Sequence, residues 1–284
     1  MAVDSAVGVF DSGIGGLSVL RHIRTQLPHE HLLYFADAGF APYGDKPEAV
    51  IVARALAIAE FLVQRGAKAL VVACNTATAA AIKALRSKYL AMPVIGVEPG
   101  LKPAAALTQS RTVGVLATER TLASAKFNLL REQISAATSV SFITQACIGL
   151  ADQVEKGELQ SAATALLVHR YVAPLIAQGA DTLVLGCTHY PFVHALIEEA
   201  AMRTGKSPVT IIDTGEAVAR QLLRLLEQDG LQNPAGDIGA LQAFTTGSRA
   251  TLATAFATLL KLDPPVTRIG VEAELIVGEA RQPI

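Results

Sequence analysis

The chain has 284 residues, a formal net charge of −1 and 17% charged residues. Hydrophobic residues make up 51% of it, which excludes an intrinsically disordered chain and supplies enough apolar side chain for a buried core. The balanced charge lacks the basic excess that binding to nucleic-acid phosphates requires, so no nucleic-acid partner is expected. At roughly 150 residues per domain, the length favours two domains.

The mean hydropathy of +0.39 is high enough that a membrane span has to be considered. A spanning helix needs about 18 consecutive apolar residues, but the longest charge-free stretch, between Glu132 and Asp152, is interrupted by Gln, Ser and Thr. A secretory signal has a basic residue before its apolar stretch, and none precedes the apolar stretch near this N-terminus. The three cysteines form no C-x-x-C pair, which disfavours disulfides and structural zinc. We therefore expect a cytoplasmic protein without a membrane partner.

Short apolar runs alternate with helical stretches along almost the whole chain. Several of the runs are apolar at consecutive positions, which is typical of parallel strands covered on both faces. The expected strands are Val7–Phe10, Leu32–Phe35, Ala69–Ala73, Val94–Val97, Val113–Leu116, Val140–Thr144, Leu183–Leu185, Val209–Ile212 and Leu241–Phe244.

Two stretches between these strands have helical spacing. From Pro47 to Gly66, apolar residues recur at helical intervals, proline suits the first turn and glycine suits the stop. A second helix is expected over Ala162–Gln178, ending at Gly179. The alternation of strands and helices predicts a parallel α/β architecture.

The sequence also contains a weak internal repeat. Val7-Gly8-Val9-Phe10 is matched by Val113-Gly114-Val115-Leu116, and Val72-Ala73-Cys74-Asn75-Thr76 by Leu185-Gly186-Cys187-Thr188-His189. The similar spacing of the two matches indicates two related α/β units, each with a cysteine at a strand end.

Four polar clusters follow expected strands, where ligands bind in parallel α/β sheets. They are Asp11-Ser12-Gly13, Pro42-Tyr43-Gly44, Cys74-Asn75-Thr76 and Cys187-Thr188-His189.

Cys74 and Cys187 each precede a small polar residue that could cap a helix, and a helix N-terminus favours thiolate over thiol. The alternative is that each cysteine simply packs in the core. Two cysteines at equivalent strand ends favour chemistry. Cys147 lacks polar followers, and we assign it to the core.

The neighbouring residues leave alternatives open. His189 could share the thiol proton of Cys187, cap a helix or be one of two zinc ligands. Asp11 could be a helix N-cap or an acid beside a thiol and a substrate amine. Gly13-x-Gly15-x-x-Ser18 is one glycine short of a dinucleotide-binding pattern, with Asp37 as its ribose-binding acid.

Taken together, the clusters resemble the glutamate racemases of the aspartate/glutamate racemase superfamily. Ala38-Gly39-Phe40 departs from the polar residues more usual there, and the chain after about residue 230 matches less clearly. The matching segments are Gly8–Gly16, Tyr34–Asp37, Pro42–Gly44, Ala73–Thr78, Gly186–Pro191 and Ile212-Asp213.

The resemblance implies a fold and a set of site residues. The fold is two pseudo-symmetric parallel-sheet α/β domains facing across an active-site cleft, one made of residues 1–97 plus 209–284 and the other of 98–208. Cys74 and Cys187 match the catalytic acid/bases, assisted by Asp11 and His189. The substrate-binding positions implied are Asp11, Ser12, Tyr43, Gly44, Asn75, Thr76, Thr188 and His189.

The resemblance also implies an activity and its partners. The expected reaction is cofactor-independent racemisation of L-glutamate to D-glutamate for peptidoglycan synthesis, without a metal, by a homodimer. Two thiols suit it, because the α-hydrogen leaves one face while a proton arrives at the other, and a thiol pKa of about 8.5 needs only modest tuning. The alternatives are an aspartate racemase, a one-cysteine decarboxylase, which two cysteines disfavour, and a non-catalytic ligand- or NAD-binding protein.

Overall fold

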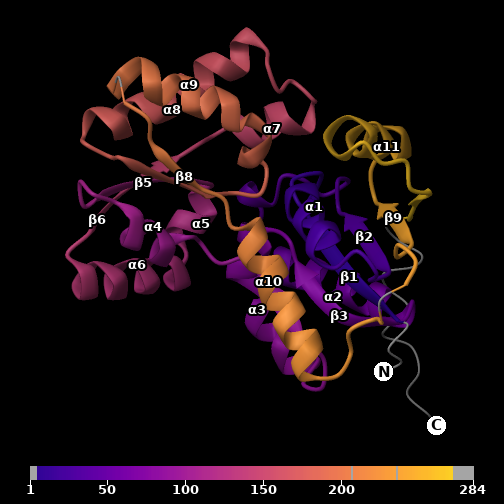
Figure 1. Ribbon diagram of the computed structural model, residues 1–284. Coiled ribbons are helices and arrows are strands. Elements are labelled where there is room, and N and C mark those ends of the chain that lie inside the picture. The colour runs from indigo at the N-terminus through magenta and orange to yellow at the C-terminus, as the bar shows by residue number, and fades with distance from the viewer. Residues whose placement is uncertain (1–4, 206, 235, 271–284) are drawn as a thin grey trace. The chain divides into compact units, whose positions relative to one another are not determined.

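The computed structural model describes residues 5–205, 207–234 and 236–270. The chain divides into two compact units, residues 1–96 with 216–284 (unit 1) and residues 97–215 (unit 2). Each unit is built around a parallel sheet with helices packed on it (Figure 1). The predicted fold class, two parallel-sheet α/β units, is confirmed.

The sheet of unit 1 has six parallel strands in the order β10-β9-β2-β1-β3-β4. Its strands β2 and β3 are buried along their whole length, which explains their runs of consecutive apolar residues. The strands are β1 (Ala6–Asp11), β2 (Leu32–Ala36), β3 (Ala67–Val72), β4 (Val94–Gly96), β9 (Leu241–Thr245) and β10 (Val266–Arg268).

The helices of unit 1 include the first of the two that were predicted. Helix α2 begins one residue after Pro47, its predicted apolar positions are buried, and Gly66 follows with a left-handed φ of 83°. The helical segments are α1 (Leu17–Gln26), the 3-10 turn η1 (Tyr43–Asp45), α2 (Glu48–Gln64), α3 (Asn75–Lys88), α10 (Gly215–Gln228), α11 (Arg249–Ala255) and the π-helical turn η3 (Phe256–Leu260).

Unit 2 contains a four-stranded parallel sheet in the order β6-β5-β7-β8. Helices α7, α8 and α9 lie on one face of this sheet, and α4 and α6 lie on the other (Figure 1). Its strands are β5 (Thr112–Ala117), β6 (Ser141–Ala146), β7 (Thr182–Gly186) and β8 (Thr210–Ile212). Its helical segments are α4 (Leu101–Leu107), α5 (Glu119–Ala123), α6 (Ala125–Thr138), α7 (Leu150–Glu155), α8 (Ala162–Ala177), the 3-10 turn η2 (Tyr190–Val193) and α9 (His194–Gly205).

The two sheets repeat the same strand order. Strands β2-β1-β3-β4 of unit 1 correspond to β6-β5-β7-β8 of unit 2, four strands later in each case. The repeated sequence segments fall on β1 and β5 and on the ends of β3 and β7. Cys74 and Cys187 therefore follow equivalent strands of two related sheets.

The border between the units differs from the sequence-based one. The chain returns to unit 1 after residue 215, whereas the sequence analysis places the return after residue 208. The intervening strand β8 pairs in parallel with β7, so it belongs to the sheet of unit 2. Strand β10, which has three residues, was not predicted.

A buried ion pair ties distant segments of unit 1 together. Lys68 Nζ lies 2.7 Å from Glu30 Oε2, and both side chains are almost fully buried. The main-chain N–H of Asn233 donates to Glu30 Oε1 at 2.7 Å, and its side-chain Oδ1 accepts from Lys68. Removing one partner would leave an unpaired buried charge, which is strongly destabilising. The group therefore holds the segment after α10 in place against β3.

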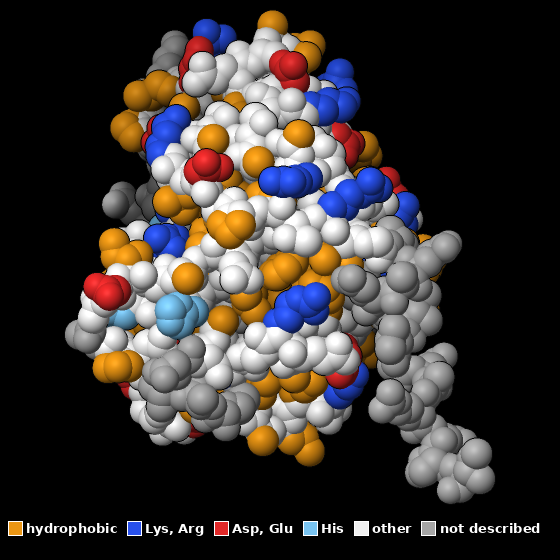
Figure 2. All heavy atoms as spheres, turned by 90° about the vertical axis from the view of Figure 1, so that its right-hand side faces the viewer, with side chains coloured by type: hydrophobic (Ala, Val, Ile, Leu, Met, Phe, Trp, Pro, Cys, Tyr) orange, Lys and Arg blue, Asp and Glu red, His pale blue; other side chains and the backbone are white. Residues whose placement is uncertain are grey.

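The surface agrees with the balanced charge of the chain. On the face drawn in Figure 2, the described Lys and Arg side chains are interspersed with Asp and Glu rather than gathered into one stripe. No helix among the described residues is long and apolar enough to cross a bilayer.

Candidate active site

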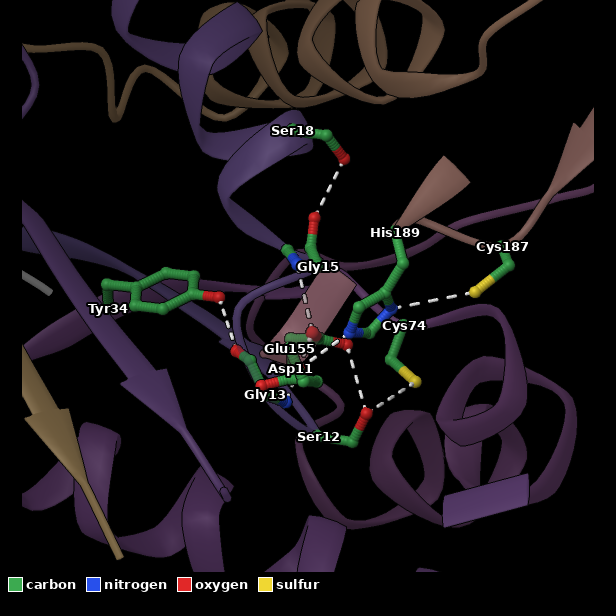
Figure 3. Close-up of polar contacts among 11 residues, drawn as sticks. Asp11, Ser12, Gly13, Gly15, Ser18, Tyr34, Cys74, Glu155, Cys187 and His189 are labelled. Atoms are coloured by element: carbon green, nitrogen blue, oxygen red, sulfur yellow. Dashed lines mark hydrogen bonds and ion pairs between the residues drawn. The ribbon is translucent and has the colours of Figure 1, made fainter. Parts of the chain in front are cut away.

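In unit 1, Asp11 organises the turn that follows β1. Its fully buried carboxylate accepts hydrogen bonds from the main-chain N–H groups of Gly13 (Figure 3), at 3.2 Å, and of Gly16, at 2.9 Å. The Tyr34 hydroxyl donates to the Gly13 carbonyl at 2.8 Å. A Cβ at Gly16 would lie 2.7 Å from Asp11 Cβ and 3.0 Å from the Tyr34 hydroxyl, so the turn requires glycine there.

Cys74 is itself the N-cap residue of α3, whereas the sequence analysis gives that role to the small polar residue after it. Its Sγ accepts a hydrogen bond from the main-chain N–H of Ala77 at 3.4 Å. The Ser12 hydroxyl lies 3.7 Å from the Cys74 sulfur and donates to Asp11 Oδ1 at 3.5 Å, so it lies between the thiol and the carboxylate (Figure 3). The N-terminus of the 14-residue helix stabilises negative charge on this sulfur.

Asn75 and Thr76 begin α3 directly after Cys74, and both are buried. Neither Nδ2 nor Oδ1 of Asn75 has a hydrogen-bond partner among the described residues. Buried polar groups are nearly always paired, so this amide is available to a ligand as far as the described residues show. Together with the helix N-terminus, it forms a site suited to an anionic or carboxylate ligand.

Tyr43 and Gly44 lie in η1. The phenol of Tyr43 is buried and donates to Asp37 Oδ2 at 2.6 Å, so the main chain of Tyr43, rather than its hydroxyl, is what it can offer to a ligand. Burial and the adjacent Asp37 charge raise the pKa of Tyr43 well above its ordinary value. Asp37 is fully buried and also binds Arg54 and Thr246, so it does not serve as the ribose acceptor of a dinucleotide.

In unit 2, Cys187 adjoins an imidazole–carboxylate pair. Cys187 Sγ lies 3.6 Å from His189 Nδ1, and His189 Nε2 lies 2.6 Å from Glu155 Oε1 (Figure 3). Burial alone lowers the pKa of His189, but the adjacent Cys187 sulfur and Glu155 carboxylate outweigh it and raise this pKa well above its usual value. The three groups form a nucleophile–base–orienter line of the kind that activates a thiol. Thr188, also buried, lies between the two predicted catalytic residues in the chain.

The zinc alternative at Cys187 and His189 does not fit this geometry. Both ring nitrogens of His189 already face protein partners. Within the described ranges, no group of three or more His, Cys, Asp or Glu side chains is arranged to hold a metal ion.

Glu155 was not identified from the sequence. It is the last residue of α7 and lies 34 residues before His189. The stretch Glu155-Lys156-Gly157-Glu158 has the composition of an exposed helix end, and nothing in it separates Glu155 from Glu158.

Cys147 lies in the core of unit 2, as predicted. It is 4% exposed, and its Sγ donates to the Gln145 carbonyl at 3.5 Å. Burial raises the pKa of its thiol far above the ordinary value, so it is a neutral thiol near pH 7.

Each unit therefore brings one cysteine together with groups able to take up or release a proton. In unit 1 these are the Ser12 hydroxyl and the Asp11 carboxylate, and in unit 2 they are His189 and Glu155. Such pairs suit general acid–base catalysis by a thiol.

Known proteins resemble this chain over most of its length. Residues 7–222 match the family model described as Asp/Glu/Hydantoin racemase. The glutamate racemase of Methylococcus capsulatus is 59% identical over 226 residues, covering 79% of this chain and 80% of the relative.

Solved structures agree with this match. A glutamate racemase isoform from Bacillus anthracis has a TM-score of 0.83 at 33% identity and covers 94% of this chain and 98% of its own. A glutamate racemase from Francisella tularensis, solved in complex with D-glutamate, has a TM-score of 0.80 at 28% identity, with coverage of 95% and 99%.

Proposed function

Because this chain belongs to the Asp/Glu/Hydantoin racemase family of isomerases, we propose that it interconverts L- and D-glutamate by a two-base mechanism in which Cys74 and Cys187 are the bases. The observation that carries the proposal is the pair of cysteines at equivalent strand ends, each beside its own proton-handling groups. Similarity to relatives that are named glutamate racemases supports the choice of substrate.

In the proposed reaction, one cysteine acts as a thiolate and removes the α-proton, while the other delivers its thiol proton to the opposite face of the α-carbon. Cys187 acts on L-glutamate and Cys74 on D-glutamate. Asp11 and His189 assist the cysteine of their own unit by stabilising the protonation state that each step requires. Each turnover exchanges the roles of the two sulfurs, so no net proton is consumed.

The substrate must also be held by groups that stabilise the carbanion. We assign this role to the polar residues around the two cysteines, whose hydrogen bonds act most strongly where water is excluded. The side-chain amide of Asn75 supports it, because it has no hydrogen-bond partner in the part of the chain that the structure describes. The proposed substrate-binding residues are Asp11, Ser12, Tyr43, Gly44, Asn75, Thr76, Thr188 and His189.

The proposed reaction needs no cofactor. The D-glutamate would supply peptidoglycan synthesis in the cytoplasm, and the enzyme would act as a homodimer, as the family resemblance implies.

Polarimetry or circular dichroism of L- and of D-glutamate with purified protein tests the activity. After exhaustive EDTA treatment and without added cofactor, both samples should converge to zero rotation. Aspartate in parallel reactions should keep its rotation. No change with either glutamate enantiomer, conversion of aspartate alone, or activity that EDTA removes and a metal restores would contradict the proposal.

A further inference from the structure

Asp37 is a buried carboxylate that the proposed reaction does not use, and it gathers hydrogen bonds from three separate segments of unit 1. Tyr43 in η1 donates to Oδ2 at 2.6 Å. Arg54 on α2 donates to both oxygens, from Nε at 2.9 Å and from a terminal nitrogen at 2.7 Å. Thr246, just after β9, donates to Oδ1 at 2.8 Å. A buried carboxylate needs such compensation, and the two-pronged arginine contact is the strongest geometry for it.

The same groups hold the loop between β2 and η1. The Arg54 guanidinium lies 3.8 Å from the centroid of the Phe40 ring, in cation–π contact. The main-chain N–H of Gly39 donates to Thr246 Oγ1 at 3.0 Å. A Cβ at Gly39 would lie 2.9 Å from the Thr246 carbonyl oxygen, so the two segments are in close contact. Phe40 therefore packs on the Arg54 guanidinium that pairs with Asp37. It is one of the residues at which this chain departs from the family pattern.

We propose that Arg54, together with Phe40 and Thr246, is a positioning unit that acts through Asp37 to hold Tyr43 and Gly44 in the conformation that binds glutamate. The inference rests on the proposed function, because it assigns Tyr43 and Gly44 to the substrate. Arg54 does not touch the reacting atoms. It keeps η1 in the binding conformation before glutamate arrives. Binding then does not carry the free-energy cost of ordering this turn, so the affinity for glutamate is higher.

The chemistry of the contact requires arginine. A lysine would carry the charge but would lack the planar fork that binds both oxygens of Asp37 and the flat face that stacks on Phe40. Burial and the adjacent Asp37 charge raise the pKa of the Tyr43 phenol, which favours its role as a hydrogen-bond donor to Asp37. Asp37 is therefore one acceptor that three side-chain donors share, Tyr43, Arg54 and Thr246.

The test uses Arg54→Met, which keeps an unbranched side chain but removes the guanidinium fork, with Arg54→Lys and Thr246→Val as milder changes. The matched control is Arg65→Met. Arg65 is the C-cap residue of the same helix, and its guanidinium also stacks on a phenylalanine, 3.5 Å from the Phe61 centroid. The KM and kcat of racemisation are measured in both directions. The rate of chymotrypsin cleavage within residues 38–46 reports the loop without substrate.

We expect Arg54→Met to raise KM about tenfold or more, because it removes a charged hydrogen bond, and to change kcat by less than about threefold. Arg54→Lys should recover part of the affinity, and Thr246→Val should raise KM about threefold. Cleavage should follow the same order. In a Tyr43→Phe background, Arg54→Met should raise KM by less than about twofold, because the link that it acts through is already cut.

The outcomes separate this inference from the proposed function. If the wild-type protein racemises glutamate but KM and cleavage rate in Arg54→Met and Thr246→Val match those of Arg65→Met, the positioning role is wrong and the proposed activity is unaffected. A full effect of Arg54→Met in the Tyr43→Phe background leads to the same conclusion. If the wild-type protein does not racemise glutamate, the proposed function is wrong, and so is the role of Arg54, Phe40 and Thr246 in glutamate binding. If Arg54→Met fails to fold, Arg54→Lys and Thr246→Val decide the matter.

Discussion

The surroundings of Cys74 and Cys187 differ more than their equivalent positions in the two sheets suggest. Cys74 caps a regular helix and faces a carboxylate through the Ser12 hydroxyl. Cys187 is followed by a short 3-10 turn that contains proline, and its sulfur contacts an imidazole backed by a carboxylate. The repeated fold determines where the sulfurs lie, and the local sequence determines how their protons are managed.

Buried charge is also distributed unevenly between the two units. The fully buried Asp, Glu and Lys side chains among the described residues, Asp11, Glu30, Asp37 and Lys68, all lie in unit 1. In unit 2 the ionisable groups of the candidate site are Cys187, His189 and the partly exposed Glu155. Unit 1 therefore holds buried carboxylates and a buried ammonium group, whereas unit 2 holds an imidazole whose pKa is raised by the adjacent Cys187 sulfur and Glu155 carboxylate.

Replacing either catalytic cysteine should have the largest effect. Cys74→Ser or Cys187→Ser leaves a hydroxyl, a far weaker base near neutral pH, so each should lower racemisation by about a thousandfold or more. Elimination from a glutamate analogue with a β-leaving group needs only one base. Cys74→Ser should process the L-analogue and Cys187→Ser the D-analogue. Equal processing of both isomers by both variants would refute the assignment.

The next effect tests the two assisting groups. Asp11→Asn and His189→Asn should each lower kcat by about a hundredfold. Because enantiomers have equal free energies, kcat/KM must stay equal in the two directions for every variant, so the asymmetry is sought in isotope effects rather than in this ratio. Asp11→Asn slows the Cys74 step and should enlarge the effect with D-[2-²H]glutamate, and His189→Asn should do so with the L-enantiomer. Matching isotope effects in the two variants would show that the assisting groups are not specific to one cysteine.

The sequence predicts most of the fold and part of the site. All nine expected strands are present, and the fully buried ones, such as β2 and β3, leave runs of consecutive apolar residues. Cys74 and Cys187 can be found because each directly follows such a run. Glu155 and Arg54 cannot, because the first reaches its partner across 34 positions and the second lies within a helix whose other residues are mostly apolar. Residues that act through tertiary contact leave no local pattern.

Glu155→Gln should have a smaller effect that depends on pH. The native pKa of His189 lies above its usual value of about 6.5, so its proton stabilises the fold fully below that pH and less as pH rises through the native pKa. Removing the Glu155 charge lowers this pKa, and each unit of lowering is worth about 1.4 kcal/mol. Urea unfolding should therefore separate the variant from wild type most at about pH 6 and least in alkali. A gap that widens in alkali would contradict the role of Glu155.

Cys147→Ser should have the smallest effect. Cys147 serves as the reference for the comparison of Cys74 with Cys187, because it is a buried thiol outside the candidate site. Cys147 shares the burial of Cys74 and Cys187 but has no assisting base, and burial raises its pKa so that it remains a neutral thiol. A serine hydroxyl can still donate to the Gln145 carbonyl, so the change should cost about 1 kcal/mol of unfolding free energy and leave kcat within about twofold. Iodoacetamide at about pH 8, mapped by mass spectrometry, should label Cys147 more slowly than the other two, because the thiolate is the reactive form. Loss of turnover in Cys147→Ser would mean that a third thiol takes part and that pairing Cys74 with Cys187 is wrong.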